Sequence, residues 1–459
     1  MKQGQRTNPA RHELGLRALK PALSAVVKEG RLTIIGAGGT RLVIESGKSG
    51  PSVAIQLHNR ALPFKLLARP SLALGEAYMD GALTVEEGTI RDLLAIVTSG
   101  LDGLDELPIE RLRAPLARIT TRLTRNRRRR AAKNVAHHYD LSNEFYALFL
   151  DEDWQYSCAY FCEGCSSLED AQAAKRSHIG QKLMVGEGMS VLDIGCGWGG
   201  LAIELAKQGA AEVLGISLSQ EQLTLARQRA EEAGFAEEAR FDFCDYRDLQ
   251  GEFDRIVSVG MFEHVGPASY GSFFRAIEEH LAPDGIAVVH SIGRMAPPGG
   301  KDPWVDKYIF PGGYIPSLSE TLSVVERMGL WVTDIEILRL HYAETLAHWY
   351  ERFQSRREKA LELFDERFCR MWEYYLAACE MMFRNGNLMV FQLQLAHKRD
   401  AVPLTREYLY TPRDQSAVPR DAGGNHSRCS CSARARPLGT SNSEGVPPMR
   451  YDTSSTSRG

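Results

Sequence analysis

The ten residues from Val191 to Gly200, VLDIGCGWGG, constrain the fold of this chain more than any other stretch. Its first part, Val191 to Ile194, is mostly apolar and predicts a short buried strand. A glycine cluster follows, and the pattern from Leu201 to Lys207 then predicts a helix. A strand, a glycine turn and a helix N-terminus in this order let backbone N–H groups approach a ligand closely. The stretch therefore predicts an α/β domain with a ligand site at the turn.

The glycine spacing, D-x-G-x-G-x-G from Asp193 to Gly199, differs from the G-x-G-x-x-G pattern of NAD and FAD sites. It resembles the S-adenosylmethionine (AdoMet) loop of the Rossmann-like methyltransferases. An ordinary strand-to-helix turn in an unrelated α/β domain is the alternative, because glycine-rich turns of this kind are common. The loop alone favours a methyltransferase without establishing one.

The region from residue 137 to 411 alternates strand and helix patterns, as a doubly wound parallel sheet requires. Beyond the glycine loop, we predict helices over 220–233, 270–281 and 344–384, and strands over 213–218, 239–244, 253–259, 285–292, 330–340 and 388–398. Ser317 and Glu320 have the spacing of a capping box for a further helix. We therefore predict the α/β class, with a Rossmann-like class I AdoMet methyltransferase domain and a smaller N-terminal α+β domain.

Four regions are predicted along the chain. Residues 1–124 form an N-terminal lipid-docking domain, with strands over 31–35 and 53–57 in small hairpins and helices over 62–68 and 89–101. Residues 125–136 form a basic linker before the methyltransferase domain, 137–411. Residues 412–459 are rich in Ser, Gly, Pro and Arg with almost no apolar residues, which predicts a disordered tail.

Basic residues gather between Arg111 and Lys133, although the whole chain carries a net charge of −3. Such a run fits a solvated linker, an anionic membrane surface or RNA phosphate. No aromatic residue interleaves with the arginines, so base stacking has little support. Among the functional interpretations we therefore favour the membrane surface over nucleic acid.

The sequence also bears on the compartment. No apolar run approaches the roughly 18–20 residues of a membrane-spanning helix, and the stretch from Met1 to Lys20 lacks the apolar core of a secretory signal. Nine cysteines at irregular spacing do not suggest a disulfide framework and point to a reducing cytoplasm. We predict a cytoplasmic protein that associates peripherally with the inner face of the membrane.

Polar groups follow five successive predicted strands, and the carboxyl ends of parallel strands meet at one edge of a sheet. The groups lie in Asp193–Gly199, Ser217–Gln222, Cys244–Arg247, Gly260–Gly266 and His290–Ile292. The second strand lacks the terminal acid that usually binds ribose hydroxyls, and its available hydrogen-bonding side chains are Ser217, Ser219 and Gln222. Five polar strand ends together predict a ligand site.

Eight ordered motifs make the sequence closely resemble the cyclopropane-fatty-acyl-phospholipid synthase family, which includes the mycolic acid cyclopropane synthases. The motifs are His138–Tyr146, Tyr156–Phe161, Val191–Gly200, Gly215–Gln222, Gly260–Gly266, His290–Ile292, Phe310–Ser317 and His341–Tyr342. The stretch from Ala77 to Gly81 also looks like the N-terminal domain of the phospholipid-acting members, which the mycolic acid enzymes lack.

The resemblance implies two sets of binding residues. AdoMet would be held by Tyr156, Ser157, Asp193, Gly195, Cys196, Gly197, Trp198, Gly199, Ser217, Ser219, Gln222, Tyr246 and Arg247. A bicarbonate ion would be held by the catalytic residues Cys158, Glu263, His290 and Tyr342 and by the backbone of Ile292. In this family the Gln222-type residue serves the ribose in place of the missing acid.

The implied reaction explains these residue types. Methyl transfer from the AdoMet sulfonium to a cis alkene leaves a carbocation, so the pocket must exclude water. Ring closure then needs a base, which a bound anion oriented by His290, Tyr342 and Cys158 can provide. Glu263 would accept a proton from bicarbonate or orient His290, and both roles stay open. Aromatic faces can stabilise the cation, and the candidates are Tyr139, Phe262 and Tyr314.

Other functions compete with a phospholipid cyclopropane synthase. A fatty-acid C-methyltransferase would share the carbocation but give a methylene- or methyl-branched chain. A non-catalytic protein that binds lipid or senses AdoMet would be expected to lack the anion-site residues. All of these residues are present. A nucleic-acid methyltransferase would leave an apolar substrate site unexplained. Unsaturated phospholipid acyl chains and an anionic membrane surface are therefore the predicted partners, and family members can be homodimers.

Some cysteine and histidine residues could have roles other than binding an anion. Cys158 could be a covalent nucleophile with His290 as its base, but AdoMet transfer needs no enzyme-bound intermediate. Cys158, Cys162 and Cys165 invite a zinc interpretation, yet no further ligand pair completes the site. The adjacent pair His137 and His138 project in different directions on a helix, which favours a buried or capping role.

Overall fold

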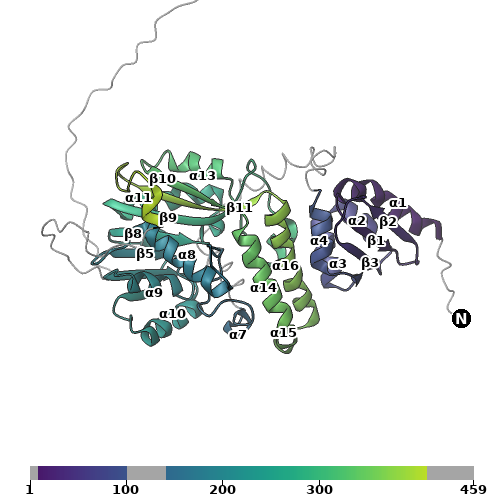
Figure 1. Cartoon of the computed structure of the whole chain (residues 1–459), viewed down its shortest axis with the longest axis horizontal. Coiled ribbons are helices and arrows are strands. Elements are labelled where there is room, and N and C mark those ends of the chain that lie inside the picture. The colour runs from purple at the N-terminus through teal and green to yellow at the C-terminus, as the bar shows by residue number, and fades with distance from the viewer. Residues whose placement is uncertain (1–8, 101–140, 411–459) are drawn as a thin grey trace, which may run out of the picture. The chain divides into compact units, whose positions relative to one another are not determined.

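The computed structural model describes residues 9–100 and 141–410 (Figure 1). The predicted basic linker, the predicted disordered tail and the arginine run all lie outside the described residues. The same is true of His137, His138 and Tyr139. Within the described ranges, no helix is long and apolar enough to cross a membrane.

The N-terminal part is a small mixed sheet with helices. Its elements are α1 (Pro9–Val26), β1 (Arg31–Ile35), β2 (Arg41–Glu45), β3 (Ser52–Leu57), α2 (Leu62–Ala68), α3 (Pro70–Met79), β4 (Leu83–Glu87) and α4 (Ile90–Thr98). The strand order is β2-β1-β3-β4. The predicted hairpin arrangement is wrong for β1 and β3, which pair in parallel. The antiparallel partner of β1 is β2, a strand that was not predicted.

A seven-stranded sheet follows, in the order β10-β11-β9-β8-β5-β6-β7. Its strands are β5 (Ser190–Ile194), β6 (Glu212–Ser217), β7 (Ala239–Phe243), β8 (Phe253–Val259), β9 (Leu281–Arg294), β10 (Trp331–Leu338) and β11 (Leu388–Ala396). The strands β5 to β9 pair in parallel, as predicted. The expectation of a wholly parallel sheet is wrong at β11, which runs antiparallel to both β9 and β10.

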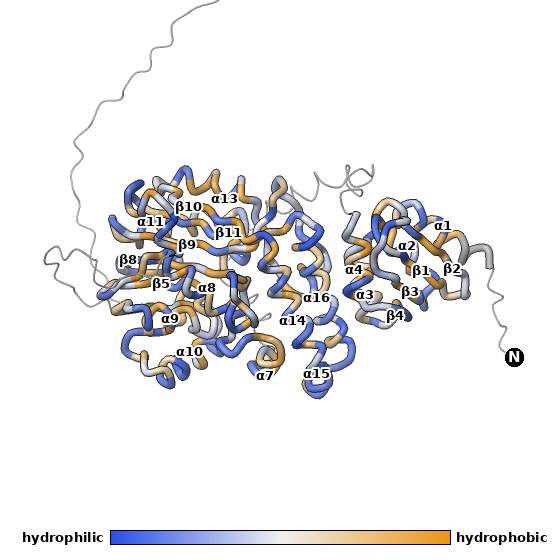
Figure 2. Tube along the Cα trace, viewed as in Figure 1, coloured by the Kyte–Doolittle hydropathy of each residue, from blue (hydrophilic) through white to orange (hydrophobic). Residues whose placement is uncertain are grey.

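Helices connect and cover these strands. They are α7 (Asn143–Tyr146), α8 (Leu168–Leu183), α9 (Gly200–Lys207), α10 (Gln220–Ala233), α11 (Tyr270–His280), α12 (Pro303–Tyr308), α13 (Leu318–Val325), α14 (His341–Ser355), α15 (Arg357–Leu363) and α16 (Glu366–Asn385). The predicted cap of α13 is present, because Ser317 Oγ accepts a hydrogen bond of 3.2 Å from the Glu320 N–H. Figure 2 shows hydrophobic residues along the sheet and a hydrophilic α15.

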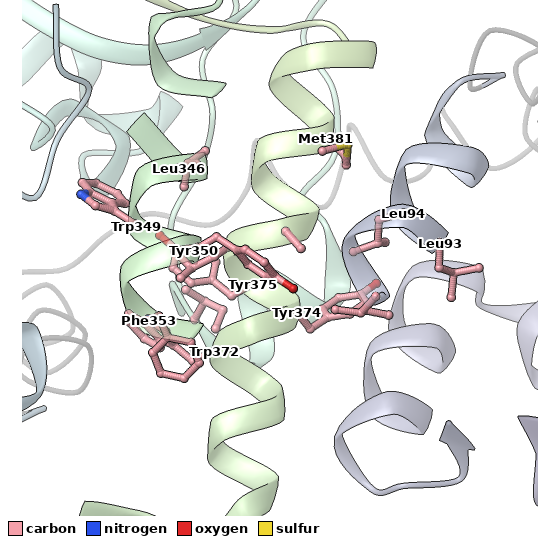
Figure 3. Close-up of a cluster of buried hydrophobic side chains, with 14 of the residues drawn as sticks. Leu93, Leu94, Leu346, Trp349, Tyr350, Phe353, Trp372, Tyr374, Tyr375 and Met381 are labelled. Carbon is pink, nitrogen blue, oxygen red and sulfur yellow. The ribbon is translucent and has the colours of Figure 1, made fainter. Parts of the chain in front are cut away.

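An aromatic cluster packs α14 against α16. Phe353 of α14 and Trp372 of α16 lie close together (Figure 3), and both rings pack on Phe145. Trp349 of α14 packs instead against Phe149 and Tyr156. Phe145 of α7 is fully buried in the same cluster. Its ring lies within 4.9–6.3 Å, centroid to centroid, of the rings of Tyr146, Phe149, Phe353, Phe364, Phe368 and Trp372.

Removing the ring of Phe145 should therefore be costly. We expect Phe145→Ala to lower the free energy of unfolding by about 3–5 kcal/mol, because it opens a cavity among rings that cannot collapse into it. The matched control is Phe243→Ala, whose side chain is 56% exposed and should change stability by less than about 0.5 kcal/mol. Urea denaturation of both variants measures the difference, and equal losses would contradict the packing argument.

Candidate active site

The glycine-rich turn after β5 adopts backbone conformations that favour glycine. Gly195 and Gly199 have φ angles of 88° and 80°, in the left-handed region. The N–H groups of Gly195 and Cys196 donate to the carbonyl of Ile216 and tie the turn to β6. Gly199 is the N-cap of α9, so the turn leads directly into a helix N-terminus as predicted.

A pocket of about 840 Å³, counting its open mouth, lies over the carboxyl ends of β5, β6, β7 and β8. Six of the predicted cofactor residues line it: Gly195, Gly197, Ser217, Gln222, Tyr246 and Arg247. Other lining residues come from the two loops already singled out in the sequence: Cys244, Asp245, Gly260, Met261, His264 and Val265. Leu218 and Ser269 also line the pocket. Ser269 follows the strand-four motif, and no pattern in the sequence pointed to it.

At the end of β6 a hydrogen-bonded group replaces the missing acid. Ser217 Oγ donates to Gln222 Oε1 at 3.2 Å and accepts from the Ser219 N–H at 3.1 Å. Ser219 Oγ in turn caps α10 by accepting from the Gln222 N–H. Ser219 therefore orients Gln222 and lies outside the pocket lining, whereas Ser217 and Gln222 face the pocket.

After β7, Asp245 organises the loop that carries Tyr246 and Arg247. Its Oδ1 accepts from the Arg247 backbone N–H at 3.1 Å and from Arg247 Nε at 2.7 Å. Tyr246 packs edge-on against Phe273, and burial raises the pKa of its hydroxyl to about 12. Asp245 belongs to the predicted Cys244–Arg247 group, although it was not among the residues implied to hold AdoMet.

Several predicted cofactor residues lie outside the pocket lining, namely Tyr156, Ser157, Asp193, Cys196, Trp198, Gly199 and Ser219. Trp198 is buried, and its Nε1 donates to Asn143 Oδ1 at 3.0 Å. The hydroxyls of Tyr156 and Tyr375 lie 3.0 Å apart. Burial raises the pKa of Asp193 to about 7, and its Oδ2 has no hydrogen-bond partner within the described ranges.

A second polar region includes Glu263, in the turn after β8, and His290, within β9. Glu263 Oε1 accepts a hydrogen bond of 2.6 Å from the Ile292 N–H, and burial raises its pKa to about 7. The Gln392 amide nitrogen lies 3.1 Å from His290 Nδ1. Burial lowers the pKa of His290 to about 3, so its imidazole is neutral at physiological pH.

Two buried atoms of this region have no hydrogen-bond partner among the residues that the structure describes: Glu263 Oε2 and His290 Nε2. Both atoms lose solvation without gaining a protein partner, which is unusual for buried polar groups. Glu263 lies between Met261 and His264, which line the pocket, and the His290 carbonyl accepts from the Gly260 N–H. Each atom is therefore a candidate contact for a small polar ligand.

The segment of Cys158 is hydrogen-bonded to α14, the helix that carries Tyr342. The Ala159 N–H, next to Cys158, donates to Thr345 Oγ1 at 3.0 Å, and Thr345 lies one turn after Tyr342. Cys158 is 1% exposed, and burial raises the pKa of its thiol well above the usual range. A covalent nucleophile needs a thiolate, so this environment argues against the nucleophile interpretation.

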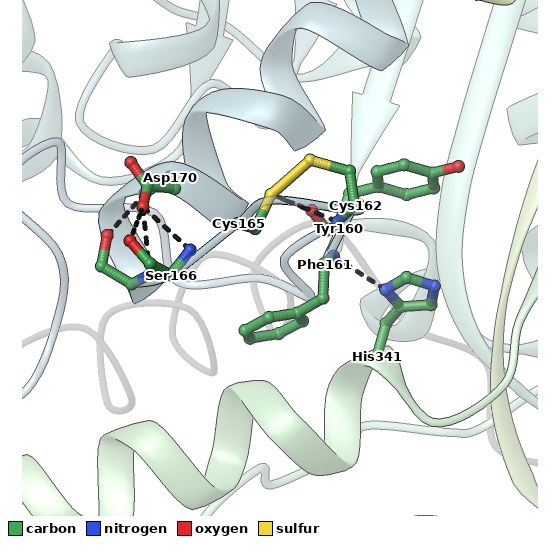
Figure 4. Close-up of a disulfide and its surroundings, with 8 residues drawn as sticks. Tyr160, Phe161, Cys162, Cys165, Ser166, Asp170 and His341 are labelled. Atoms are coloured by element: carbon green, nitrogen blue, oxygen red, sulfur yellow. Dashed lines mark hydrogen bonds between the residues drawn. A yellow bond between two sulfur atoms is a disulfide. The ribbon is translucent and has the colours of Figure 1, made fainter.

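Two of the three cysteines considered as zinc ligands are bonded to each other. Cys162 and Cys165 form a disulfide (Figure 4), so the expectation drawn from irregular cysteine spacing is wrong at this pair. The C-x-x-C spacing places the two sulfur atoms close enough to bond. Next to it, the Phe161 N–H donates to His341 Nδ1 at 2.9 Å. Within residues 9–100 and 141–410, no group of three His, Cys, Asp or Glu side chains is arranged to hold a metal ion.

Two aromatic candidates for cation stabilisation have other contacts. Phe262 is fully buried and stacks on Tyr270 with ring centroids 4.4 Å apart, so it belongs to the core beneath α11. Tyr314 donates its hydroxyl to Glu320 Oε2 at 3.1 Å, and its backbone N–H donates to the Glu263 carbonyl. Tyr314 therefore supports the loop of Glu263.

The parallel strands, the glycine turn and the pocket over the strand ends define a Rossmann-like class I AdoMet-dependent methyltransferase fold. Residues 126–393 match the family model described as mycolic acid cyclopropane synthetase, and residues 35–102 match a domain of unknown function, DUF7884. The chain belongs to the mycolic acid cyclopropane synthetase family. Enzymes of this family transfer a one-carbon group from AdoMet to lipid acyl chains, where it becomes part of a cyclopropane ring or a methyl group.

The names of similar proteins refer to both types of activity. A probable fatty acid methyltransferase of Pseudomonas putida is 40% identical over 75% of this chain and 88% of the relative. The cyclopropane-fatty-acyl-phospholipid synthase of Escherichia coli K12 is 39% identical over 72% of this chain and 84% of the relative. The structure of mycolic acid cyclopropane synthase CmaA1 with SAH and CTAB is similar with a TM-score of 0.55 and 33% identity, covering 57% of this chain and 97% of that one.

Proposed function

We propose that this protein adds a methylene group to the cis double bond of an unsaturated phospholipid acyl chain and so forms a cyclopropane ring. The observation that carries the proposal is the buried pair of unpartnered atoms, Glu263 Oε2 and His290 Nε2, next to the pocket. Ring closure from the methylated cation releases a proton, and buried groups that can accept or pass on a proton support that step. The relatives' names support a lipid acyl chain as the substrate.

AdoMet, when bound, supplies an electrophilic methyl group. In our proposal the backbone at Gly195 and Gly197 lies against it, Ser217 and Gln222 bind its ribose, and the loop from Asp245 to Arg247 brackets its adenine. The pocket lining supports these contacts, because all of these residues face the same hollow. Tyr156, Ser157, Asp193, Cys196, Trp198, Gly199 and Ser219 then shape the site around the cofactor.

We propose that a bicarbonate ion fits beside Glu263 and His290. The neutral imidazole of His290 can donate from Nε2, and the hydroxyl of Tyr342 can also donate. The thiol of Cys158 donates to the Ala159 carbonyl at 3.3 Å, so it would have to turn from that carbonyl to the ion. Because the Ile292 N–H already donates to Glu263, the backbone contribution of Ile292 would be its carbonyl oxygen. Glu263, with a pKa near 7, can take up the proton released on ring closure.

A fatty-acid C-methyltransferase remains the second candidate, because the relative from Pseudomonas putida carries that name. Both candidates share methyl transfer and the resulting carbocation. They differ in which proton leaves the cation and whether a reductant acts afterwards. The geometry of Glu263 and His290 supports proton removal in either case, so the product has to decide between them.

We also propose that the N-terminal region docks the enzyme on the cytoplasmic face of an anionic membrane. Leu14 and Phe64 are 60% and 46% exposed, and the Phe64 ring lies close to Gly15, next to Leu14. Lys65 follows Phe64 in α2 and adds positive charge beside this apolar spot. Exposed apolar side chains flanked by cations suit an anionic lipid surface.

The decisive experiment supplies vesicles of cis-unsaturated phospholipid, bicarbonate and AdoMet with a deuterated methyl group. Mass spectrometry of the released acyl chains should show a gain of one CH₂ unit, loss of one label atom and resistance to hydrogenation. A labelled methylene or methyl branch would assign the second candidate. An enzyme that binds AdoMet but yields no acyl product would contradict both proposals.

A further inference from the structure

The disulfide between Cys162 and Cys165 takes no part in the methyl transfer or in the anion site proposed above. It lies in the loop between the segment of Cys158 and helix α8 (Figure 4). Cys162 is exposed and Cys165 is partly exposed, so small molecules in solution can reach the pair. A thiolate that attacks one sulfur atom of a disulfide opens it through a mixed disulfide. The pair is therefore open to thiol–disulfide exchange.

The loop that carries the disulfide is anchored on α8. The Cys162 N–H donates to Cys165 Sγ at 3.2 Å, and the Cys165 N–H donates to the Cys162 carbonyl at 3.1 Å. The N–H groups of Ser166 and Ser167, which follow, both donate at 3.1 Å to Asp170 Oδ2 in the first turn of α8. The disulfide thus belongs to a compact turn with a fixed attachment point.

On its other side the loop contacts α14. The Phe161 N–H, next to Cys162, donates to His341 Nδ1 at 2.9 Å. The ring of Tyr160 stacks on His341 with ring centroids 5.0 Å apart and an interplanar angle of 9°. His341 is the first residue of α14 and directly precedes Tyr342, one of the predicted catalytic residues. A shift of the turn at Cys162 therefore reaches the start of α14 through this hydrogen bond and ring contact.

The same loop holds the segment of Cys158. The Ala159 N–H donates to Thr345 Oγ1 at 3.0 Å, and the Tyr160 N–H donates to the Ala171 carbonyl at 3.0 Å. These two bonds attach the segment to α14 and to α8. Cys158 itself is 1% exposed, so its own thiol is shielded from exchange with small molecules.

We propose that Cys162 and Cys165 are a reversible redox modification site that reacts with small thiols and disulfides and controls the activity of the neighbouring site. In oxidation, the two cysteine thiols give up two electrons and two protons as their S–S bond forms. A small disulfide RSSR accepts them, its own S–S bond breaks, and two RSH molecules leave. Reduction is the reverse exchange. The proposal needs only the family's transfer of one-carbon groups to acyl chains, whichever product results.

The disulfide form should be the more active one. In that form the bond between the two sulfur atoms limits the conformations of the turn, whereas the reduced turn loses more conformational entropy when it makes the same hydrogen bonds. We therefore expect the bonds from Ala159 and Phe161 to α14 to open more often after reduction. Cys158 and Tyr342 are then held less precisely, which slows a reaction that depends on their positions.

The first test asks whether the pair reacts reversibly. The full-length protein is equilibrated at a series of ratios from fully reduced to fully oxidised glutathione, free thiols are alkylated, and peptides are analysed by mass spectrometry. We expect the pair Cys162 and Cys165 to pass from dithiol to disulfide over these ratios, while Cys158 stays a thiol. A pair that keeps one state at every ratio, or that forms only stable mixed disulfides with glutathione, would overturn the proposal.

The second test compares the two redox states by amide hydrogen exchange and by transfer of labelled methyl groups from AdoMet to vesicle lipids. Reduction of the wild type should speed exchange at Ala159 and Phe161 by about tenfold and slow methyl transfer by about fivefold or more. The double variant Cys162→Ser, Cys165→Ser should match the reduced wild type in every buffer. The matched control replaces the other close pair of cysteines in the sequence, as Cys429→Ser, Cys431→Ser, and should respond like the wild type.

Wild-type protein with the same amide exchange and methyl transfer in both redox states would overturn the proposal. A double variant Cys162→Ser, Cys165→Ser that still responds to reductant would also overturn it. Wild-type protein that transfers no methyl group in either state would instead contradict the proposed function, and the glutathione titration and the amide exchange would still decide the redox proposal.

Discussion

Replacing Glu263 by glutamine is expected to lower kcat by roughly 10²- to 10⁴-fold, the usual contribution of a positioned acid or base. The variant keeps an oxygen that can accept from the Ile292 N–H. It loses the buried Oε2, which has no partner among the described residues and which we assign to the proton transfer. AdoMet affinity should change little, because Glu263 lies outside the pocket lining.

Steady-state kinetics with labelled AdoMet and vesicles measure this effect. The control is Glu279→Gln on the exposed side of α11, which should leave kcat unchanged.

The pH profile gives a second check, because burial raises the pKa of Glu263 to about 7. The ionised fraction rises with pH through this value, so kcat/KM should rise up to about pH 7 and then level. His290 stays neutral over this range. A Glu263→Gln enzyme with wild-type kcat would show that Glu263 does not take part in the proton transfer.

The second large effect is expected for Gly199→Ala at the start of α9. A Cβ at Gly199 would lie 2.8 Å from Phe241 Cζ and 2.9 Å from Ala226 Cβ, both buried. The left-handed φ of 80° costs an alanine about 1–2 kcal/mol, and the overlap adds about 1–3 kcal/mol. We therefore expect the free energy of unfolding to fall by about 2–5 kcal/mol. AdoMet binding should weaken as the turn shifts.

Gly234→Ala is the matched control for this prediction. Gly234 caps α10 with a φ of 77°, and an added Cβ would meet no atom within 4 Å. The free energy of unfolding of Gly234→Ala should fall only by the conformational cost of about 1–2 kcal/mol. Urea denaturation and calorimetry with AdoMet compare the two variants. Equal losses of stability would show that the contact with Phe241 is unimportant.

Much of the fold could be predicted because the hydrophobic periodicity of the sheet region is strong. The predicted helix over 220–233 agrees with α10, and the predicted strands over 239–244 and 253–259 agree with β7 and β8 within a residue. The missed elements have weaker patterns. Helix α8 buries Gln172, Lys175 and Lys182, so its inner face does not look apolar in the sequence. The short strands β2 and β4 have partly exposed faces and no clear alternation.

For the candidate site, the residue types at the strand ends and the order of the motifs could be read from the sequence. These are local properties, set by strand periodicity, by glycines that permit a left-handed turn and by caps such as Ser317. Which of these groups face the pocket depends on the packing of the whole domain. In the folded protein, Trp198 donates to Asn143 and the Ile292 N–H donates to Glu263. Strand β11 runs antiparallel to β9. Lys175 is buried against Ser157. Such pairings join residues far apart in the chain, and they depend on packing and desolvation in three dimensions, which no local pattern records.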